Sequence, residues 1–113
     1  MIEQYRFGLI VINGTQYHHD VIVFRDQVIH DWWRASGHEL CIADIQRSVD
    51  QFQPEIVVVG TGKFGLMKVL PETEKWLNSR QIELIAQKTP QACQTFDKLL
   101  ESRSVMGAFH LTC

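Results

Sequence analysis

Short apolar runs separated by polar breaks fill the first third of the chain. Residues 7–12 form one such run, rich in Ile and Val, and the dipeptide Asn13-Gly14 follows it directly. Asn-Gly tolerates a positive φ at both central positions of a tight turn, so we expect a β-hairpin at this point. Further short strands are expected at residues 15–17, 21–24 and 28–32. The first third is therefore predicted to be an antiparallel set of strands.

A helical pattern begins beyond the polar break at residues 36–38. Apolar side chains recur there at the spacing of one helix face, and they are Ile42, Ile45, Val49 and Phe52. This period predicts a helix near residues 42–52. Pro54 ends the helix, because proline cannot continue it.

The next segment, residues 55–60, has an unbroken Ile-Val-Val-Val centre. A strand of this kind has no polar face. We therefore expect both of its faces to be covered, as they are in a parallel sheet.

Helices and strands then alternate to the end of the chain. Pro71 opens a helix, and the two glutamates in the same turn suit the positive end of that helix. A strand at 82–86, a helix beginning at Thr89-Pro90 and a strand at 105–112 follow. This order predicts an α/β fold with a parallel sheet and right-handed crossovers, to which the first third adds an antiparallel layer or extension. Because no linker or repeat divides the chain, a single domain over residues 1–113 is expected.

Composition and charge narrow the classes of partner. The chain has a net charge of -2, with 45% hydrophobic and 21% charged residues, and its basic residues form no cluster. Binding to nucleic acid or to an anionic membrane is therefore not expected. The apolar runs are also far too short to span a bilayer, so membrane insertion is not expected.

The cysteines indicate a reducing environment. There are three of them, Cys41, Cys93 and Cys113, without C-x-x-C spacing. An odd number of cysteines without C-x-x-C spacing argues against a disulfide framework and against a structural zinc site. The first strand begins so close to Met1 that no leader is expected, and a cytoplasmic protein is predicted.

Gly60, Gly62 and Gly65 spell G-x-G-x-x-G after the apolar strand. A dinucleotide-binding turn needs a helix that begins inside this motif, but the best helix start is Pro71. A phosphate loop needs a hydroxyl residue after Lys63, where this chain has Phe64. We therefore interpret the glycines as a sharp bend, with unusual backbone angles and close backbone approach, where the strand ends.

An alternative is a small anionic ligand at the carboxyl ends of the parallel strands, where ligands of open sheets collect. Lysines and a helix N-terminus with free amides at Thr89 favour negative charge there. The candidate ligand-binding residues are Gly60, Thr61, Gly62, Lys63, Lys88, Thr89 and His110.

Catalytic and metal-binding patterns are weak. The histidines lack the H-x-x-x-H spacing of a helical metal site, so neither a metal nor another cofactor is expected. Cys93 lies near an inward helix stripe, and Ser36, His38 and Asp44 do not form a supported triad. No catalytic residue is assigned, and a non-enzymatic protein is favoured.

Trp32, Trp33 and Arg34 are consecutive. Neighbouring residues on a strand face opposite ways, so one tryptophan is expected in the core and the other at the surface. Trp33 and Arg34 are the candidate partner surface, because Trp and Arg are typical interface anchors.

Several motifs together resemble a known family over essentially the whole chain. They are Tyr5-x-Phe7-Gly8, Tyr17-x-x-Asp20-Val21, Trp33-Arg34-x-x-Gly37-His38, the stretch from Pro54 to Gly62 and the ending from Gly107 to Cys113. The chain is similar to small α/β proteins of a domain-of-unknown-function family that includes a mitochondrial complex I assembly factor and a vertebrate adipogenesis-associated protein. The resemblance implies three layers, with a central parallel sheet, helices and an antiparallel β layer. It implies no established activity and no catalytic residues.

Two hypotheses for function follow. The first is a non-enzymatic binding or assembly module with a protein partner at Trp33. The second is a small anionic-ligand-binding protein, or an enzyme, with its site at the carboxyl edge of the sheet.

Overall fold

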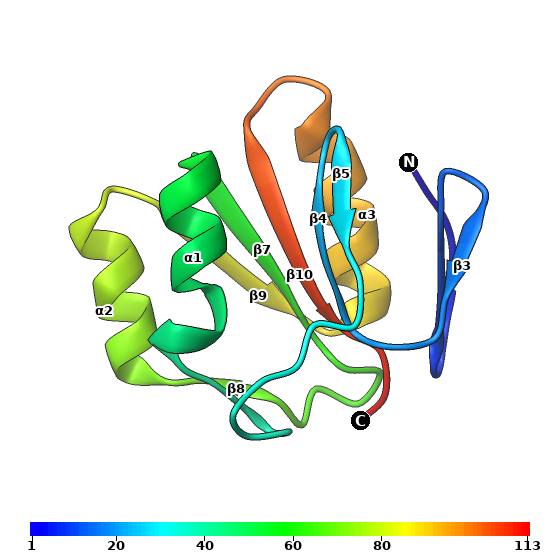
Figure 1. Cartoon of the computed structure of the whole chain (residues 1–113), viewed down its shortest axis with the longest axis horizontal. Coiled ribbons are helices and arrows are strands. Elements are labelled where there is room, and N and C mark those ends of the chain that lie inside the picture. The colour runs from blue at the N-terminus through cyan, green and yellow to red at the C-terminus, as the bar shows by residue number, and fades with distance from the viewer.

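The computed structural model describes residues 1–113, which form ten strands and three helices. In chain order they are β1 (Ile2–Arg6), β2 (Leu9–Ile12), β3 (Thr15–Tyr17), β4 (Val21–Phe24), β5 (Gln27–Ile29), β6 (Glu39–Leu40), α1 (Ile42–Phe52), β7 (Ile56–Thr61), β8 (Lys68–Val69), α2 (Pro71–Ser79), β9 (Glu83–Gln87), α3 (Thr89–Leu100) and β10 (Val105–His110). Figure 1 shows them.

The central sheet has five strands in the order β5-β4-β10-β7-β9. Its strands β10, β7 and β9 are parallel, whereas β4 runs antiparallel to β10 and β5 antiparallel to β4. The expected α/β fold with a parallel sheet is confirmed. The parallel part is extended by two antiparallel strands from the first third, because every residue of Val21–Phe24 is buried and needs cover on both faces.

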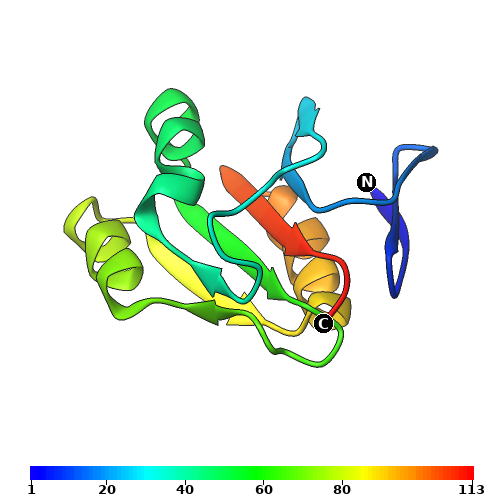
Figure 2. The same ribbon diagram turned by 60° about the horizontal axis from the view of Figure 1, so that its bottom comes forward.

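The strands β1, β2 and β3 form a separate antiparallel sheet. Figures 1 and 2 show this sheet and α3 on one side of the central sheet, with α1 and α2 on the other. The expected antiparallel β layer is therefore present, and the fold has three layers.

Alternate residues of the central strands face two different cores. In β7, Ile56 and Val58 pack with α3 and β2, whereas Val57 and Val59 pack with residues of α1 and α2. The same alternation holds in β4 and β10. The apolar run read from the sequence is thus an interior strand with a hydrophobic layer on each side.

The predicted helices are observed at or close to their expected bounds. The helix near 42–52 is α1, and its first turn is capped by Asp44, whose Oδ2 accepts the N–H of Cys41 at 2.9 Å. The helices that begin at Pro71 and at Thr89 are α2 and α3.

Strand bounds in the first third were predicted less well. The strand expected at 7–12 begins only at Leu9, because Phe7 and Gly8 form a turn in which Gly8 has φ +76°. The prediction missed β1, whose sequence Ile-Glu-Gln-Tyr-Arg alternates too weakly to signal a strand. The strand expected at 28–32 ends at Ile29. The Asn13-Gly14 hairpin is confirmed, with φ values of 49° and 81° and Ile12 paired with Thr15.

No helix in the structure combines the length and the apolar character that crossing a membrane requires.

Candidate functional site

The loop after β7 is a glycine bend and not the start of a helix. The next helix after β7 is α2, which begins at Pro71. Gly62 has φ +102° and Gly65 has φ +73°, a region that favours glycine. A Cβ at Gly60 would lie 2.8 Å from Thr89 Oγ1, so the strand exit also approaches α3 closely. The interpretation of the glycines from the sequence is confirmed.

The backbone donors of this loop are used inside the protein. The N–H of Lys63 donates to the carbonyl of Thr112 at 2.7 Å, and the N–H of Leu66 donates to that of Cys113 at 2.9 Å. The N–H of Gly62 donates to Thr89 Oγ1 at 2.8 Å. These amides point at different acceptors, so they do not converge on one external anion.

Thr89 holds the loop, the start of α3 and the end of β10 together. Its buried hydroxyl accepts from Gly62 and donates to the carbonyl of His110 at 2.7 Å, and its own N–H donates to the carbonyl of Gly62 at 3.1 Å. Pro90, the next residue, has no N–H. The Thr89 amide itself is therefore not free, because a tertiary contact occupies it.

The structure brings the candidate ligand residues together at the carboxyl edge of the parallel strands. The Thr61 hydroxyl donates to the carbonyl of Gln87 at 3.1 Å. Lys88 passes beside Gly65, with its Cγ 3.3 Å from the position of a Cβ there. Lys63 is exposed, whereas Gly60, Gly62, Thr89 and His110 are buried and bond or pack against one another. The accessible cationic groups are therefore the two lysines.

A buried ionic cluster of Asp20, Arg34 and His110 lies at the same edge. Asp20 Oδ2 is 2.6 Å from Arg34 Nη1 and 2.8 Å from His110 Nδ1, and Oδ1 accepts the N–H of Leu111 at 2.8 Å. The exposed fractions of the three side chains are 14%, 4% and 8%. From the sequence, Asp20 was named only as part of a family motif, and this role was missed. The available signal was its position directly before an all-apolar strand.

The cluster keeps Asp20 ionised. Burial favours the neutral carboxyl and raises its pKa, but hydrogen bonds from His110, the Leu111 amide and Arg34 more than offset this. The pKa of Asp20 therefore lies below its ordinary value. Nδ1 of His110 lies within hydrogen-bonding distance of both the Asp20 carboxylate, at 2.8 Å, and Arg34 Nη2, at 3.0 Å.

The order Asp20, His110, Thr112 is that of a catalytic triad, but its last contact is too long. Nε2 of His110 is 3.5 Å from Thr112 Oγ1, beyond the separation at which a base takes a hydroxyl proton. The structure also places no group of three or more His, Cys, Asp or Glu side chains where they could hold a metal ion. The contacts that the cluster makes join the residue before β4, the Arg34 loop and the end of β10.

The two adjacent tryptophans have opposite environments. Trp32 is buried, with its Nε1 donating to the carbonyl of Asp44 at 3.0 Å, whereas 73% of Trp33 is exposed. One buried and one exposed tryptophan were expected. The cause differs, since both lie in the loop after β5 and not on a strand.

Arg34 is not part of the surface, and this corrects the sequence prediction. Its guanidinium pairs with Asp20, donates from Nη2 to the carbonyl of Gly37 at 3.0 Å and lies 4.9 Å from the centroid of the Trp32 ring. Its Nε is buried without a partner. Arg34 thus anchors the loop that carries Trp33 from below, where a partner would not reach it.

Three loops present large apolar side chains at this end of the molecule. The exposed large hydrophobic residues are Phe7, Trp33, Phe64 and Leu66. The rings of Phe7 and Phe64 are 6.4 Å apart. Gly8, beside Phe7, donates to the carbonyl of Leu111 at 2.9 Å. The loops of Phe7, Phe64 and Leu66 thus bond directly to residues 111–113, and the Trp33 loop is tied to the same segment through Arg34 and Asp20. We call these four residues the apolar end.

Comparison with known proteins gives a family and a fold. Residues 2–110 match the sequence model of a protein family whose description is "protein of unknown function (DUF498/DUF598)". A conserved hypothetical protein of Pyrococcus horikoshii has a similar crystal structure, with a TM-score of 0.88 and 24% identity over 100% of this chain and 99% of that chain.

Two further structures share the fold. A Bartonella henselae chain described as an outer membrane protein has a TM-score of 0.82 and 23% identity, over 99% of this chain and 94% of that chain. A Bordetella pertussis protein described as an Mth938-like domain has a TM-score of 0.80 and 19% identity, over 98% and 85% of the two chains. At these identities the likeness concerns the fold alone.

Proposed function

We propose a function on the premise that this chain belongs to the DUF498/DUF598 family of proteins of unknown function: it is a binding or assembly module that docks a partner protein on its apolar end. The family resemblance expected from the sequence motifs is thereby confirmed. Membership brings no activity with it, so the proposal depends on the geometry of this chain.

The convergence of three loops carries the proposal. Phe7, Trp33, Phe64 and Leu66 are the large hydrophobic residues that the fold leaves exposed, and all of them lie in loops anchored at residues 111–113. Scattered exposed apolar residues need no explanation, whereas a group at one end of a molecule is typical of an interaction surface. Trp33 suits the centre of such a surface, because tryptophan is enriched among the residues that dominate binding energy.

The loops are held in place before any partner arrives. The Trp33 loop is fixed from beneath by the Asp20–Arg34 pair, and the loop of Phe64 by hydrogen bonds to Thr112 and Cys113. Ordering a flexible loop on binding costs free energy, and a loop that is already ordered avoids this cost. This rigidity supports docking of a partner protein.

The alternative, a small anionic ligand at Lys63 and Lys88, has less support. The amides that would cradle an anion already donate to Thr89, Thr112 and Cys113. Two lysines without converging backbone donors form a weak anion site.

The test is affinity capture with the tagged chain and three variants. Trp33→Ala and Phe64→Ala are expected to lose a stoichiometric partner that the parent chain retains, because truncating a central anchor costs about 2 kcal/mol or more. The control is Gln51→Ala, which changes an exposed residue of α1 outside the apolar end and is expected to keep the partner. Melting temperatures establish that each variant is folded. A partner that survives both aromatic truncations places the interface elsewhere and contradicts the proposal.

A further inference from the structure

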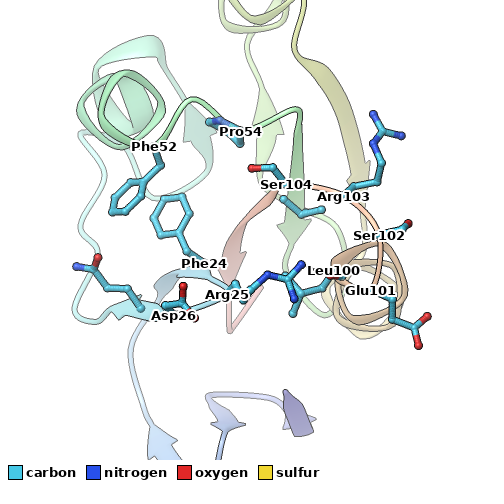
Figure 3. A pocket seen from close by; sticks show the side chains of 12 residues that line it. Phe24, Arg25, Asp26, Phe52, Pro54, Leu100, Glu101, Ser102, Arg103 and Ser104 are labelled. Atoms are coloured by element: carbon cyan, nitrogen blue, oxygen red, sulfur yellow. Dashed lines mark hydrogen bonds between the residues drawn. The ribbon is translucent and has the colours of Figure 1, made fainter.

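A second feature, an open cleft, lies at the opposite end of the molecule. Its volume is about 520 Å³, in the range of small-molecule sites. Three segments surround it, namely the β4–β5 turn, the residues that end α1 and the connection from α3 to β10. Figure 3 shows the side chains that line it.

One wall of this cleft is aromatic. The rings of Phe24 and Phe52 stack with centroids 3.8 Å apart and an interplanar angle of 27°. In Figure 3 they lie together on the side facing Ser104 and Arg25. Phe24 is packed into the core beneath, so this wall is held in position. Phe24 is only 7% exposed, so a flat ring in the cleft would stack against the half-buried Phe52, and offset stacking is a favoured arrangement for aromatic groups.

The turn between β4 and β5 supplies one charge of each sign. Arg25 reaches across the cleft and donates from Nη2 to the carbonyl of Leu100, which leaves the other N–H groups of its guanidinium available. Asp26 follows directly, is exposed and forms no ion pair. Glu101 and Arg103 on the far rim add one further charge of each sign, and Arg103 also pairs with Glu55, outside the lining, at 3.4 Å. The lining is therefore charge-balanced, which suits a zwitterion better than a phosphorylated ligand whose several negative charges would face Asp26 and Glu101.

We propose that this cleft binds a free amino acid with a flat aromatic side chain. The carboxylate of the ligand pairs with Arg25, its ammonium group pairs with Asp26, and its ring stacks on Phe52, which Phe24 holds in place. The assignment is independent of the apolar end, which lies at the other end of the parallel strands.

Calorimetric titration of the full chain with three small molecules tests the assignment. The probe is L-tryptophan, and the comparison ligands are tryptamine, which lacks the carboxylate, and indole-3-propionate, which lacks the ammonium group. L-tryptophan is expected to saturate the protein, and each comparison ligand to bind at least tenfold more weakly, because each loses one charge-assisted hydrogen bond.

Two variants assign the contacts to residues, and a third serves as the control. Asp26→Asn is expected to weaken L-tryptophan at least tenfold while leaving tryptophan and indole-3-propionate nearly equal in affinity. Arg25→Met is expected to weaken L-tryptophan at least tenfold and to leave L-tryptophan and tryptamine nearly equal in affinity. Arg25 also caps the end of α3, so the melting temperature of the Arg25→Met variant is measured to establish that it is folded. If that variant is poorly folded, Asp26→Asn provides the test. Arg6→Met, an exposed strand residue outside the cleft, is the matched control.

Three results overturn the proposal. They are the absence of saturable L-tryptophan binding at millimolar concentration, equal affinity for the three ligands, and unchanged affinity in Asp26→Asn. Trp33→Ala is expected to bind L-tryptophan as the parent chain does, so failure at one end of the molecule is distinguishable from failure at the other.

Discussion

Asp20 links parts of the chain that are far apart in sequence. Its carboxylate holds Arg34 from the loop before β6, His110 from the end of β10 and the backbone of Leu111. A buried charge is costly unless it is paired and hydrogen-bonded, and here both oxygens are used. Arg34 acts through the same cluster, because it fixes the loop that presents Trp33 without being exposed itself.

The lowered pKa of Asp20 leads to a prediction about pH. A carboxyl whose folded pKa lies below its unfolded value, here near 3.8, contributes stability at higher pH and loses it as pH falls through the folded pKa. Asp20→Asn is therefore expected to be less stable than the parent chain at neutral pH, and the difference is expected to shrink below about pH 4. Urea unfolding at several pH values measures it.

The control for this prediction is Asp31→Asn, which changes an exposed carboxyl paired only with the exposed His30. A difference in unfolding free energy between Asp20→Asn and the parent chain that stays constant down to pH 2.5, or grows, would show that the folded cluster does not favour the ionised carboxylate.

At the scale of elements, the exit from β7 determines what the glycine motif does. The chain bends at Gly62 and passes against residues 112–113 before β8, and the next helix, α2, begins only at Pro71. The same three glycines would bind a pyrophosphate only if a helix began among them. The element that follows the motif thus decides between a binding turn and a packed bend.

Two glycine substitutions separate backbone strain from steric conflict. Gly14 has φ +81° with open space around a Cβ, whereas a Cβ at Gly62, φ +102°, would lie 2.2 Å from the backbone of Cys113. Gly14→Ala is expected to lower the free energy of unfolding by about 1 kcal/mol, the cost of a left-handed conformation alone. Gly62→Ala is expected to cost at least twice as much, since residues 112–113 must also move.

Urea denaturation of both variants measures this difference. If Gly14→Ala and Gly62→Ala lower the free energy of unfolding equally, residues 111–113 move aside at little energetic cost. The anchoring of the apolar end would then be weaker than its hydrogen bonds indicate.

At the scale of the whole molecule, one sheet separates two cores. The strands β4, β10 and β7 give alternate side chains to a core with α3 and the small antiparallel sheet, and to a core with α1 and α2. β10 lies between β4 and β7, and all six of its residues are buried. The apolar end and the aromatic cleft lie at opposite ends of these strands.

Amide hydrogen exchange is expected to reflect this arrangement. The slowest exchange should occur in β7 and β10, since both have a paired strand on each side and a core on each face. The fastest exchange among the strands should occur in β3, an exposed edge of the small sheet. Exchange measured by mass spectrometry or NMR tests the order, and protection of β3 comparable to that of β10 would contradict it.

Local signals in the sequence predicted much of the fold. The period of Ile42, Ile45, Val49 and Phe52 matched α1, Pro71 matched the start of α2, and Asn13-Gly14 matched its hairpin. These signals are local because helical periods, proline geometry and tight turns depend on a few neighbouring residues. β1 was missed because its own five residues show no clear alternation of apolar and polar side chains.

The sequence by itself determined the order of helices and interior strands, the glycine bend after β7 and the family of the chain. Each of these depends on the residue types within short segments of the chain. Only the tertiary structure decided that β4 and β5 join the central sheet, that Arg34 is buried on Asp20, that the Thr89 amide is occupied and that the loops of four exposed apolar side chains are all tied to residues 111–113. The physical reason is that burial, charge pairing and hydrogen-bond partners are set by residues distant in the chain. Asp20 and Leu111 are neighbours only after folding.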